Sequence, residues 1–262
     1  MNATVLERIV AETREELARR KREHPLEQAI SASAAAPPAG ARRLRDALSE
    51  PGVGVIAEFK RRSPSAGALH AAPDLAAIVS AYQRGGALAV SILTEGPNFG
   101  GSLEDLRAAR EACALPLLRK DFIVDAYQLH EARAAGADAV LLIVAALSPG
   151  ALEALYGDAV ALGLDVLVEV HDREELEVAL ALGAEIVGIN NRDLRDFSVD
   201  LERTSRLMEH VPSGVSVVSE SGIASAAQLR ALRARGVAGV LVGESLMRAA
   251  DPAAAVGKLA SI

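Results

Sequence analysis

Residues 131–144 read EARAAGADAVLLIV, and this stretch indicates the fold class of the chain. A polar, helix-forming segment ends at Gly136, and an apolar run rich in Val, Leu and Ile follows directly. Glycine favours the left-handed conformation that ends a helix. A nearly continuous apolar run is typical of a parallel strand that is buried on both faces. The stretch therefore predicts a helix followed by a buried parallel strand.

The same junction recurs along the chain. A glycine followed by Ala or Val also precedes an apolar run at Gly86, Gly183 and Gly236. Eight short apolar runs begin about 20–35 residues apart, which is the size of a strand, a helix and two loops. These runs span residues 53–59, 88–93, 117–119, 139–144, 166–170, 186–189, 215–218 and 239–242.

The segments between the runs carry signals for helix starts. Ser102, Ser148 and Asp172 are side chains that accept hydrogen bonds from a first helical turn. Pro149 suits the first helical position, and Glu175 has the capping-box spacing from Asp172. Strands are therefore expected to alternate with helices.

Eight such strand–helix units predict an α/β protein, a closed (β/α)8 TIM barrel. The alternative is an open doubly wound sheet, which favours a G-x-G-x-x-G turn after its first strand. Here the first run continues into residues 58–65, EFKRRSPS, which contain no glycine. This segment favours the barrel.

A helical extension is expected before the barrel. Residues 3–23 have Val5, Ile9, Val10 and Leu17 near helical spacing among charged residues, which predicts an amphipathic helix. Residues 30–40 predict a turn-rich linker, and a short helix is expected over residues 44–48. We therefore expect an extension over residues 1–49 and a catalytic barrel domain over residues 50–262.

Composition limits the function. The 262 residues are 50% hydrophobic and 24% charged, the balance of an ordinary globular protein. A net charge of −7 and only 3% aromatic residues argue against nucleic-acid binding. Cys113 is the one cysteine, and the histidines are scattered, so no metal site is expected. No apolar run is long enough to span a bilayer, and no signal peptide is evident, so we expect a cytoplasmic protein.

The candidate catalytic residues lie at the ends of the predicted strands, where barrel enzymes carry their chemistry. Glu58 and Lys60 are two residues apart, so a strand directs both to one side. Charges in a partly desolvated barrel mouth shift each other's pKa values, which suits proton transfer. The other polar residues at strand ends are Lys120, Glu169, Asn190, Asn191, Arg192, Glu220 and Glu244.

Plainer interpretations exist for each residue. Glu58 and Lys60 could form an inert ion pair, and Lys120 could be ordinary loop charge. Asn190 could belong to a turn, because Asn tolerates left-handed backbone. We read His171 and Cys113 as structural or surface residues. The coincidence of so many polar residues at strand ends favours a site.

A phosphate site is expected in the loops after the seventh and eighth strands, as in many barrels. Gly222 and Gly243 would let backbone N–H groups approach an anion, and Ser63 could add a hydroxyl. The alternative is that these Gly/Ser pairs only cap helices.

At the level of motifs, the chain resembles the indole-3-glycerol phosphate synthase family over nearly its whole length. The N-terminal segment Leu6–Val10 is similar to the family's extension. The segments that carry the resemblance include IAEFKRRSPS (56–65), LRKDFIV (118–124), VEVH (168–171), GINNRDL (188–194), SESGI (219–223) and GESLMR (243–248).

The resemblance implies tryptophan biosynthesis by closure of an indole ring, with decarboxylation and dehydration of a carboxyphenylamino-deoxyribulose phosphate. It implies no metal and no organic cofactor. Lys120 matches the family's general acid, and Glu169 and Lys60 match residues of the dehydration, with their division open. Glu58 would orient the lysines, and Asn190 and Glu220 would bind sugar hydroxyls. The implied substrate-binding residues are Ser63, Phe99, Phe122, Leu141, Arg192, Leu194, Ser221, Gly222 and Gly243.

The chain departs from the family pattern in two places. Glu244 stands beside Gly243, where some members have Ser, so its side chain cannot donate to phosphate. No aromatic residue precedes Phe59, so a cover from the extension must be aliphatic or absent. A phosphosugar isomerase or a non-catalytic barrel subunit remain the alternatives. We expect a monomer or weak oligomer that binds a phosphorylated small molecule and no membrane, with possible association with neighbouring enzymes of the tryptophan pathway.

Overall fold

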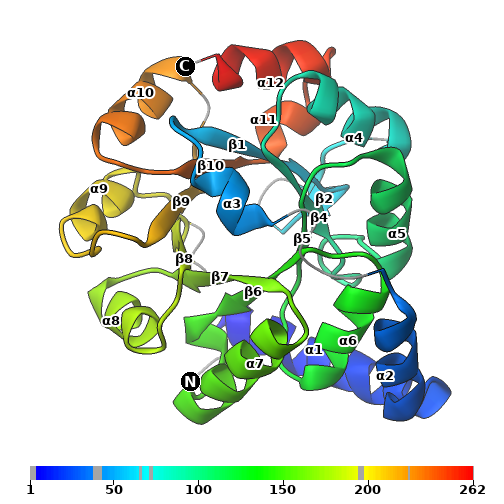
Figure 1. Ribbon diagram of the computed structural model, residues 1–262. Helices are drawn as coiled ribbons and strands as arrows, with labels where there is room; N and C mark the ends of the chain where they lie inside the picture. The colour runs from blue at the N-terminus through cyan, green and yellow to red at the C-terminus, as the bar shows by residue number, and fades with distance from the viewer. Residues whose placement is uncertain are drawn as a thin grey trace.

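The computed structural model describes residues 4–37, 43–64, 67–70, 73–193, 198–223 and 225–261. Eight parallel strands close into a barrel in the order β1-β10-β9-β8-β7-β6-β5-β4, as predicted (Figure 1). The strands are β1 (Gly54–Phe59), β4 (Ala89–Leu93), β5 (Leu117–Lys120), β6 (Ala139–Ile143), β7 (Asp165–Val170), β8 (Ile186–Asn190), β9 (Ser216–Glu220) and β10 (Gly239–Val242).

The polar residues that the sequence predicted at strand ends lie in or directly after the observed strands. Glu58 lies inside β1, while Lys120, Asn190 and Glu220 are the last residues of β5, β8 and β9. Register fixes their neighbours, because Asn190 pairs with Glu220 across β8 and β9. A short hairpin of β2 (Arg62–Ser63) and β3 (Gly67–Ala68) follows β1. The backbone itself therefore gathers these side chains at one end of the barrel.

Helices surround the strands. They are α4 (Leu75–Arg84), α5 (Leu103–Ala112), α6 (Ala126–Ala134), α7 (Pro149–Ala161), α8 (Arg173–Ala181), α9 (Glu202–Met208), α10 (Ala226–Ala234) and α12 (Pro252–Ala260), with the shorter η1 (Val144–Ala146) and α11 (Glu244–Met247). Ser102, Ser148 and Asp172 cap α5, α7 and α8 as predicted. Gly136 and Gly183 adopt φ of 88° and 81° after α6 and α8, the left-handed turn that their junctions require. None of the helices in these ranges is long and apolar enough to cross a membrane.

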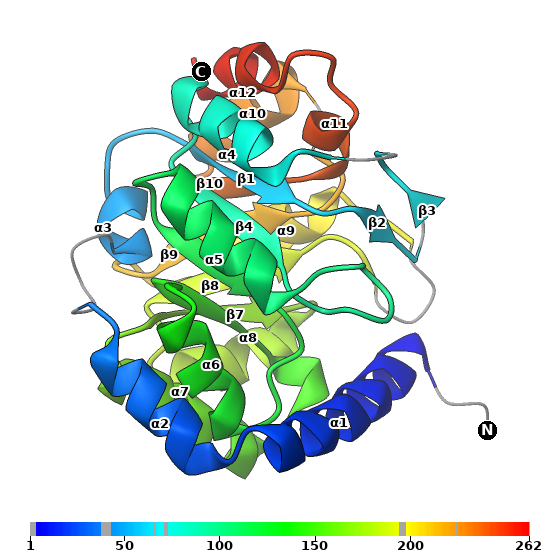
Figure 2. The same ribbon diagram turned by 90° about the vertical axis from the view of Figure 1, so that its right-hand side faces the viewer.

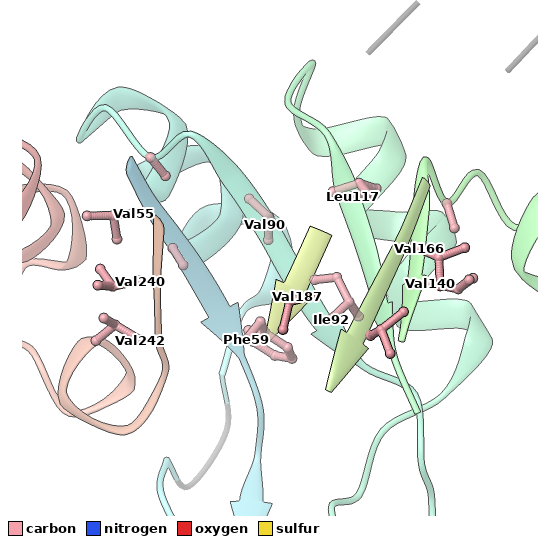
Figure 3. Packing of buried hydrophobic residues seen from close by; sticks show 14 of the residues in the cluster. Val55, Phe59, Val90, Ile92, Leu117, Val140, Val166, Val187, Val240 and Val242 are labelled. Atoms are coloured by element: carbon pink, nitrogen blue, oxygen red, sulfur yellow. The ribbon is translucent and has the colours of Figure 1, made fainter. Parts of the chain in front are cut away.

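The core has two layers. Val55, Val90, Val140 and Val187 point outward from the strands toward the helices and are fully buried (Figure 3). Ile56, Leu118, Leu141, Leu167 and Val218 belong to a second cluster on the opposite side of the strands, inside the barrel. Burial on both faces explains why the strands are continuous apolar runs in the sequence.

Three helices precede the barrel: α1 (Val5–Glu23), α2 (Leu26–Ala35) and α3 (Leu44–Leu48). The expected helices over 3–23 and 44–48 are present. The expected linker over 30–40 is wrong in its first half, because residues 30–35 form the second half of α2. Small Ala and Ser side chains let this helix pack against α6. Residues 38–40 lie outside the described ranges.

The short helix α3 closes the end of the barrel at which the strands begin. Figure 1 looks onto this end and shows α3 in front of the strand ring. Leu44 and Leu48 are buried in the same interior cluster as Ile56 and Leu118. A Cβ on Gly239 would lie 2.7 Å from Leu48 Cδ2, so the helix approaches the strands closely. The barrel interior is therefore completed by residues that precede β1.

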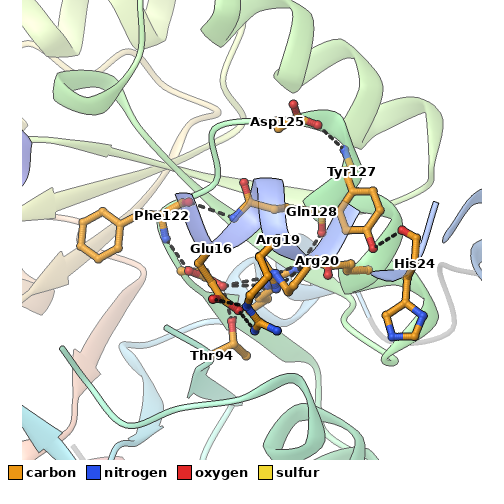
Figure 4. Close-up of polar contacts among 12 residues, drawn as sticks. Glu16, Arg19, Arg20, His24, Thr94, Phe122, Asp125, Tyr127 and Gln128 are labelled. Atoms are coloured by element: carbon orange, nitrogen blue, oxygen red, sulfur yellow. Dashed lines mark hydrogen bonds and ion pairs between the residues drawn. The ribbon is translucent and has the colours of Figure 1, made fainter. Parts of the chain in front are cut away.

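Helix α1 lies beside α6 (Figure 2), and polar contacts hold it there (Figure 4). Tyr127 donates a hydrogen bond of 2.9 Å to the His24 carbonyl. Arg20 Nη1 lies 3.1 Å from Glu131 Oε2, and Lys21 Nζ lies 2.6 Å from Asp125 Oδ2. These contacts fix the C-terminal half of α1.

Candidate active site

A cavity of about 460 Å³ opens among the C-terminal ends of the barrel strands. Leu194 lies outside the described residues. Asn191 does not line the cavity. The other site residues that the sequence predicted do, namely Glu58, Lys60, Ser63, Phe99, Lys120, Phe122, Leu141, Glu169, Asn190, Arg192, Glu220, Ser221, Gly222, Gly243 and Glu244.

Lys120 lies at the centre of the charged wall. Its Nζ is 2.8 Å from Glu169 Oε2 and 2.9 Å from Glu220 Oε2. Both carboxylates are almost completely buried. Their burial is tolerable because a cation pairs with them.

The cluster shifts the pKa of each member. Burial lowers the pKa of Lys120, but the charges of Glu169, Glu220 and Glu58 outweigh burial, and the pKa rises above its usual value. Burial raises the pKa of Glu220 to about 7, helped by Glu169 and Glu58 and opposed by Lys120. Burial also raises the pKa of Glu169, but the charges of Lys120 and His171 and the hydrogen bonds from Lys120 and Asn190 outweigh burial and lower it. The lowered pKa of Glu169 favours its ionised form, whereas Glu220 titrates near neutrality.

A second lysine–glutamate pair lies on β1 and the loop that follows. Lys60 Nζ donates to Glu58 Oε1 over 2.7 Å, and the Glu58 side chain is 5% exposed. A Cβ on Gly243 would lie 2.5 Å from that same oxygen. The pair therefore lies close against the backbone of the loop after β10, and a side chain at position 243 would displace the carboxylate of Glu58.

Only one member of the asparagine pair faces the cavity. The Arg192 N–H donates to Asn190 Oδ1 over 3.0 Å, which orients the amide so that Nδ2 donates to Glu169 Oε1 over 3.1 Å. Asn191 instead bonds Ser219 and Thr204 behind the strands. Asn190 is the last residue of β8 and not a left-handed turn residue, and its amide links the backbone after the strand to Glu169.

An aromatic and aliphatic wall faces the charges. The rings of Phe99 and Phe122 are tilted at 36° with centroids 6.3 Å apart. Leu141 extends this wall. The sequence analysis missed Leu93 and Ile143, which also line the cavity. Strand alternation could have found Ile143, since it lies two residues after Leu141 and points to the same face.

The opposite end of the cavity is formed by loops after β9 and β10. Ser221 and Gly222 have φ of 67° and 78°, so two consecutive left-handed residues shape the first loop. Arg248 lines the cavity, and its Nε lies 3.3 Å from Glu244 Oε1. The sequence analysis missed Arg248, although its spacing of four from Glu244 on a short helix was a usable signal.

A buried arginine lies behind Lys120. Arg119 is fully buried, and its Nη2 donates to Asp121 Oδ2 over 2.8 Å while its Nη1 donates to the Gln128 carbonyl over 2.7 Å. Asp121 Oδ1 in turn accepts from the Phe122 N–H over 2.8 Å. Figure 4 shows this network reaching from Phe122 and Thr94 to Gln128 and Arg20. It fixes the backbone on both sides of Lys120.

His171 lies closer to the chemistry than the sequence analysis expected. Its side chain is 11% exposed and lies beside Glu169, with Nε2 3.5 Å from Glu169 Oε1. The capping box expected from Asp172 to Glu175 is also only half formed, because Glu175 accepts from the His171 N–H rather than from that of Asp172. The side chain of Glu175 is thereby turned toward His171.

Ionisable side chains and an apolar wall in one cavity at the C-terminal ends of eight parallel strands are the arrangement of a (β/α)8-barrel enzyme. The family model described as indole-3-glycerol phosphate synthase matches residues 6–259. The chain belongs to this family, which comprises carboxy-lyases of tryptophan biosynthesis.

Named relatives agree with this assignment. The chain is 52% identical over 248 residues to indole-3-glycerol phosphate synthase 2 of Streptomyces coelicolor, covering 95% of each chain. It is 48% identical to the indole-3-glycerol phosphate synthase of Mycolicibacterium smegmatis, covering 98% of this chain and 94% of the relative.

Solved structures of other barrels share the fold alone. A thiamine phosphate pyrophosphorylase from Pyrococcus furiosus superposes with a TM-score of 0.60 at 22% identity, covering 83% of this chain and 96% of that one. An N-acetylmannosamine-6-phosphate 2-epimerase from Clostridium perfringens gives 0.62 at 17% identity, covering 79% and 91%.

Proposed function

We propose that the cavity converts 1-(2-carboxyphenylamino)-1-deoxyribulose 5-phosphate to indole-3-glycerol phosphate, carbon dioxide and water. The observation that carries this proposal is Lys120, held between two buried carboxylates and next to an aromatic wall. Ring closure needs a proton donor close to a flat apolar surface, and this cavity offers both.

The first step is attack of the anthranilate ring carbon on the sugar ketone. The ketone oxygen gains negative charge as the carbon–carbon bond forms, and Lys120 donates the proton that turns it into a hydroxyl. The carboxylate then leaves as carbon dioxide, and its electron pair restores the aromatic ring. The charges of Glu169, Glu220 and Glu58 keep Lys120 protonated before the step by raising its pKa.

The second stage removes water, which needs an acid for the departing hydroxyl and a base for a C–H proton. Glu169 accepts hydrogen bonds from Lys120 and Asn190, and its pKa is lowered, so it is ionised and suits the base. Lys60 is the cation on the other side of the site and suits the acid. Asn190 and Glu220 bind sugar hydroxyls in this scheme.

Substrate binding is divided between the two ends of the cavity. The anthranilate ring lies on Phe99, Phe122 and Leu141, and Arg192 pairs with its carboxylate. Leu194 is proposed for the same wall. Ser63, Ser221, Gly222 and Gly243 bind the phosphate through hydroxyl and backbone N–H groups.

The test is formation of the indole product from purified protein and this substrate, followed by fluorescence. We expect turnover to be unchanged by a chelator, because the proposed steps use only side chains. A phosphosugar isomerase would give no indole fluorescence, and a non-catalytic barrel would leave the substrate unchanged. Either outcome contradicts the proposal.

The setting of the enzyme is also a proposal. We place it in the cytoplasm, as a monomer or weak oligomer that can associate with neighbouring enzymes of tryptophan synthesis. The division into an extension over 1–49 and a barrel domain over 50–262 remains a proposal as well.

A further inference from the structure

His171 presents a polar atom that the proposed chemistry does not use. Its Nε2 is buried and forms no hydrogen bond to any described residue, and it points at Glu169 Oε1 from 3.5 Å. Its other nitrogen, Nδ1, lies 3.1 Å from Glu175 Oε2. The imidazole therefore lies between two carboxylates, one of them in the active site.

The hydrogen-bond partners fix where the protons lie. An ionised carboxylate only accepts, so the contact with Glu175 places a proton on Nδ1 of His171. A neutral ring would then direct the lone pair of Nε2 at an oxygen of Glu169. That arrangement is repulsive unless a proton lies between the two atoms.

The hydrogen bonds that Glu169 accepts determine which partner holds this proton. Its Oε2 already accepts from Lys120 over 2.8 Å, and its Oε1 accepts from Asn190 over 3.1 Å. These donors favour the ionised form of Glu169. The proton therefore belongs to His171 Nε2, and the ring carries a positive charge.

We propose that His171 is a positioning residue for Glu169, a charged imidazolium held from behind by Glu175 that keeps the proposed base ionised and directed into the cavity. This inference rests on the proposed role of Glu169.

The surroundings of His171 support the charge. Burial lowers the pKa of His171, but the hydrogen bond to Glu175 and the charges of Glu169 and Glu175 raise it above its ordinary value. Arg203 on α9 opposes them, although Asp193 lies 3.9 Å from its guanidinium. Glu169, Glu175 and Arg203 are the charged groups that face the ring from β7, α8 and α9.

Two substitutions separate the contacts of the ring. His171→Asn ends near the position of Nδ1, so it can keep the bond to Glu175 while losing Glu169. His171→Gln can reach Glu169 but carries no charge. His210→Asn is the matched control, because His210 is exposed at the end of α9.

The first measurement is an NMR titration of the histidine ring protons in the enzyme without substrate. The chain has five histidines, so the signal lost in His171→Asn is assigned directly. We expect its midpoint to lie above about 6.5, the ordinary histidine value, and to fall in Glu175→Gln. A midpoint at or below the ordinary value overturns the proposal, and this titration does not depend on turnover.

The second measurement is kcat as a function of pH with the substrate named above. The parent should fall to a lower plateau as His171 loses its proton. Both variants should lack this step and have kcat about tenfold lower at neutral pH, which corresponds to the loss of about 1.4 kcal/mol of interaction between the imidazolium and Glu169. Variant profiles parallel to that of the parent, at equal urea midpoints, would also overturn the proposal. Absence of any turnover in the parent would instead refute the proposed function.

Discussion

Lys120 and Glu220 form an ion pair through one oxygen of Glu220, and the other oxygen has no hydrogen-bond partner among the residues that the structure describes. Lys120 Nζ lies 2.9 Å from Glu220 Oε2, while Glu220 Oε1 is buried and forms no hydrogen bond within the described residues. A Cβ on Gly188 would lie 2.2 Å from that oxygen, so the glycine in β8 leaves space for the carboxylate of Glu220. Two predictions follow from this pair.

Lys120→Met keeps most of the side-chain stem and removes the proton donor. We expect kcat to fall by about 10²–10⁴-fold, the usual contribution of a general acid. KM should change little, because the phosphate and the ring make the binding contacts. Steady-state kinetics with the indole product as readout measures both.

The control is Lys258→Met, since Lys258 is exposed on α12. It should retain the activity of the parent. A Lys120→Met enzyme with kcat within about threefold of the parent, far short of the general-acid range, would remove Lys120 from the role.

Glu220 should make the stability of the protein depend on pH. Burial raises its pKa from 4.5 to about 7. The native state therefore binds more protons than the unfolded state between these values, and stability falls as the pH rises through this window. The contribution of Glu220 to the free energy of unfolding is complete below pH 4.5 and is lost above about pH 7.

Glu220→Gln removes this titration. The difference in urea midpoint, variant minus parent, should grow in favour of the variant between about pH 5 and about pH 8. Glu153→Gln, an exposed change on α7, should show a constant difference. A constant difference for Glu220→Gln as well would mean that its carboxyl does not titrate near neutrality.

The fold was predictable because one pattern repeats. Each strand is buried on both faces, so each is an apolar run, and glycines such as Gly136 mark the helix ends in the sequence. The helix over residues 30–35 was not predictable by the same logic. Its Ala and Ser residues form no apolar stripe, and its packing against α6 depends on a partner about 100 residues away.

The site residues at strand ends were predictable because the fold brings such ends together. Lys120, Glu169 and Glu220 follow from that rule, although their distances do not. His171 and Arg119 were not recognised as parts of the site. Their importance comes from partners on other elements, Glu175 and Gln128 among them, which no local pattern reveals.

Ser63→Ala should test the proposed phosphate end. Ser63 lines the cavity in β2, and alanine removes only its hydroxyl. We expect KM to rise about tenfold to a hundredfold, the value of one hydrogen bond to a charged group, with kcat nearly unchanged. Thermal protection by inorganic phosphate should weaken in parallel, and Ser80→Ala on α4 is the control.

Gly222→Val is a poorer probe of the same end. Gly222 is left-handed, and its added Cβ would lie 2.6 Å from Val199 Cγ1, so folding would suffer as well. If inorganic phosphate protects Ser63→Ala as well as it protects the parent, the hydroxyl does not contact the anion.

The N-terminal helices should divide into a structural part and a part that serves the cavity. Leu44 and Leu48 on α3 fill the barrel interior. Ile9 on α1 joins the same cluster, next to Phe99 and Phe122 of the cavity wall, and Glu12 accepts from Asn98 Nδ2 over 2.9 Å. Removing α3 should therefore cost stability, whereas removing α1 and α2 should act mainly on the cavity.

Two truncated chains test this division, one beginning at residue 38 and one at residue 50. The first should fold, with a urea midpoint close to that of the parent, and should lose about tenfold in kcat/KM, because a less covered cavity admits water and weakens its charges by about 1.4 kcal/mol. The second also lacks Leu44 and Leu48, and a buried leucine is worth about 2–5 kcal/mol, so it should unfold at far lower urea. Leu44→Ala in the full chain is the matched point change, and it should lower the free energy of unfolding by the same value of about 2–5 kcal/mol for one leucine. If the chain beginning at residue 38 keeps full kcat/KM, α1 does not serve the cavity. If it fails to fold, α1 and α2 belong to the structural core.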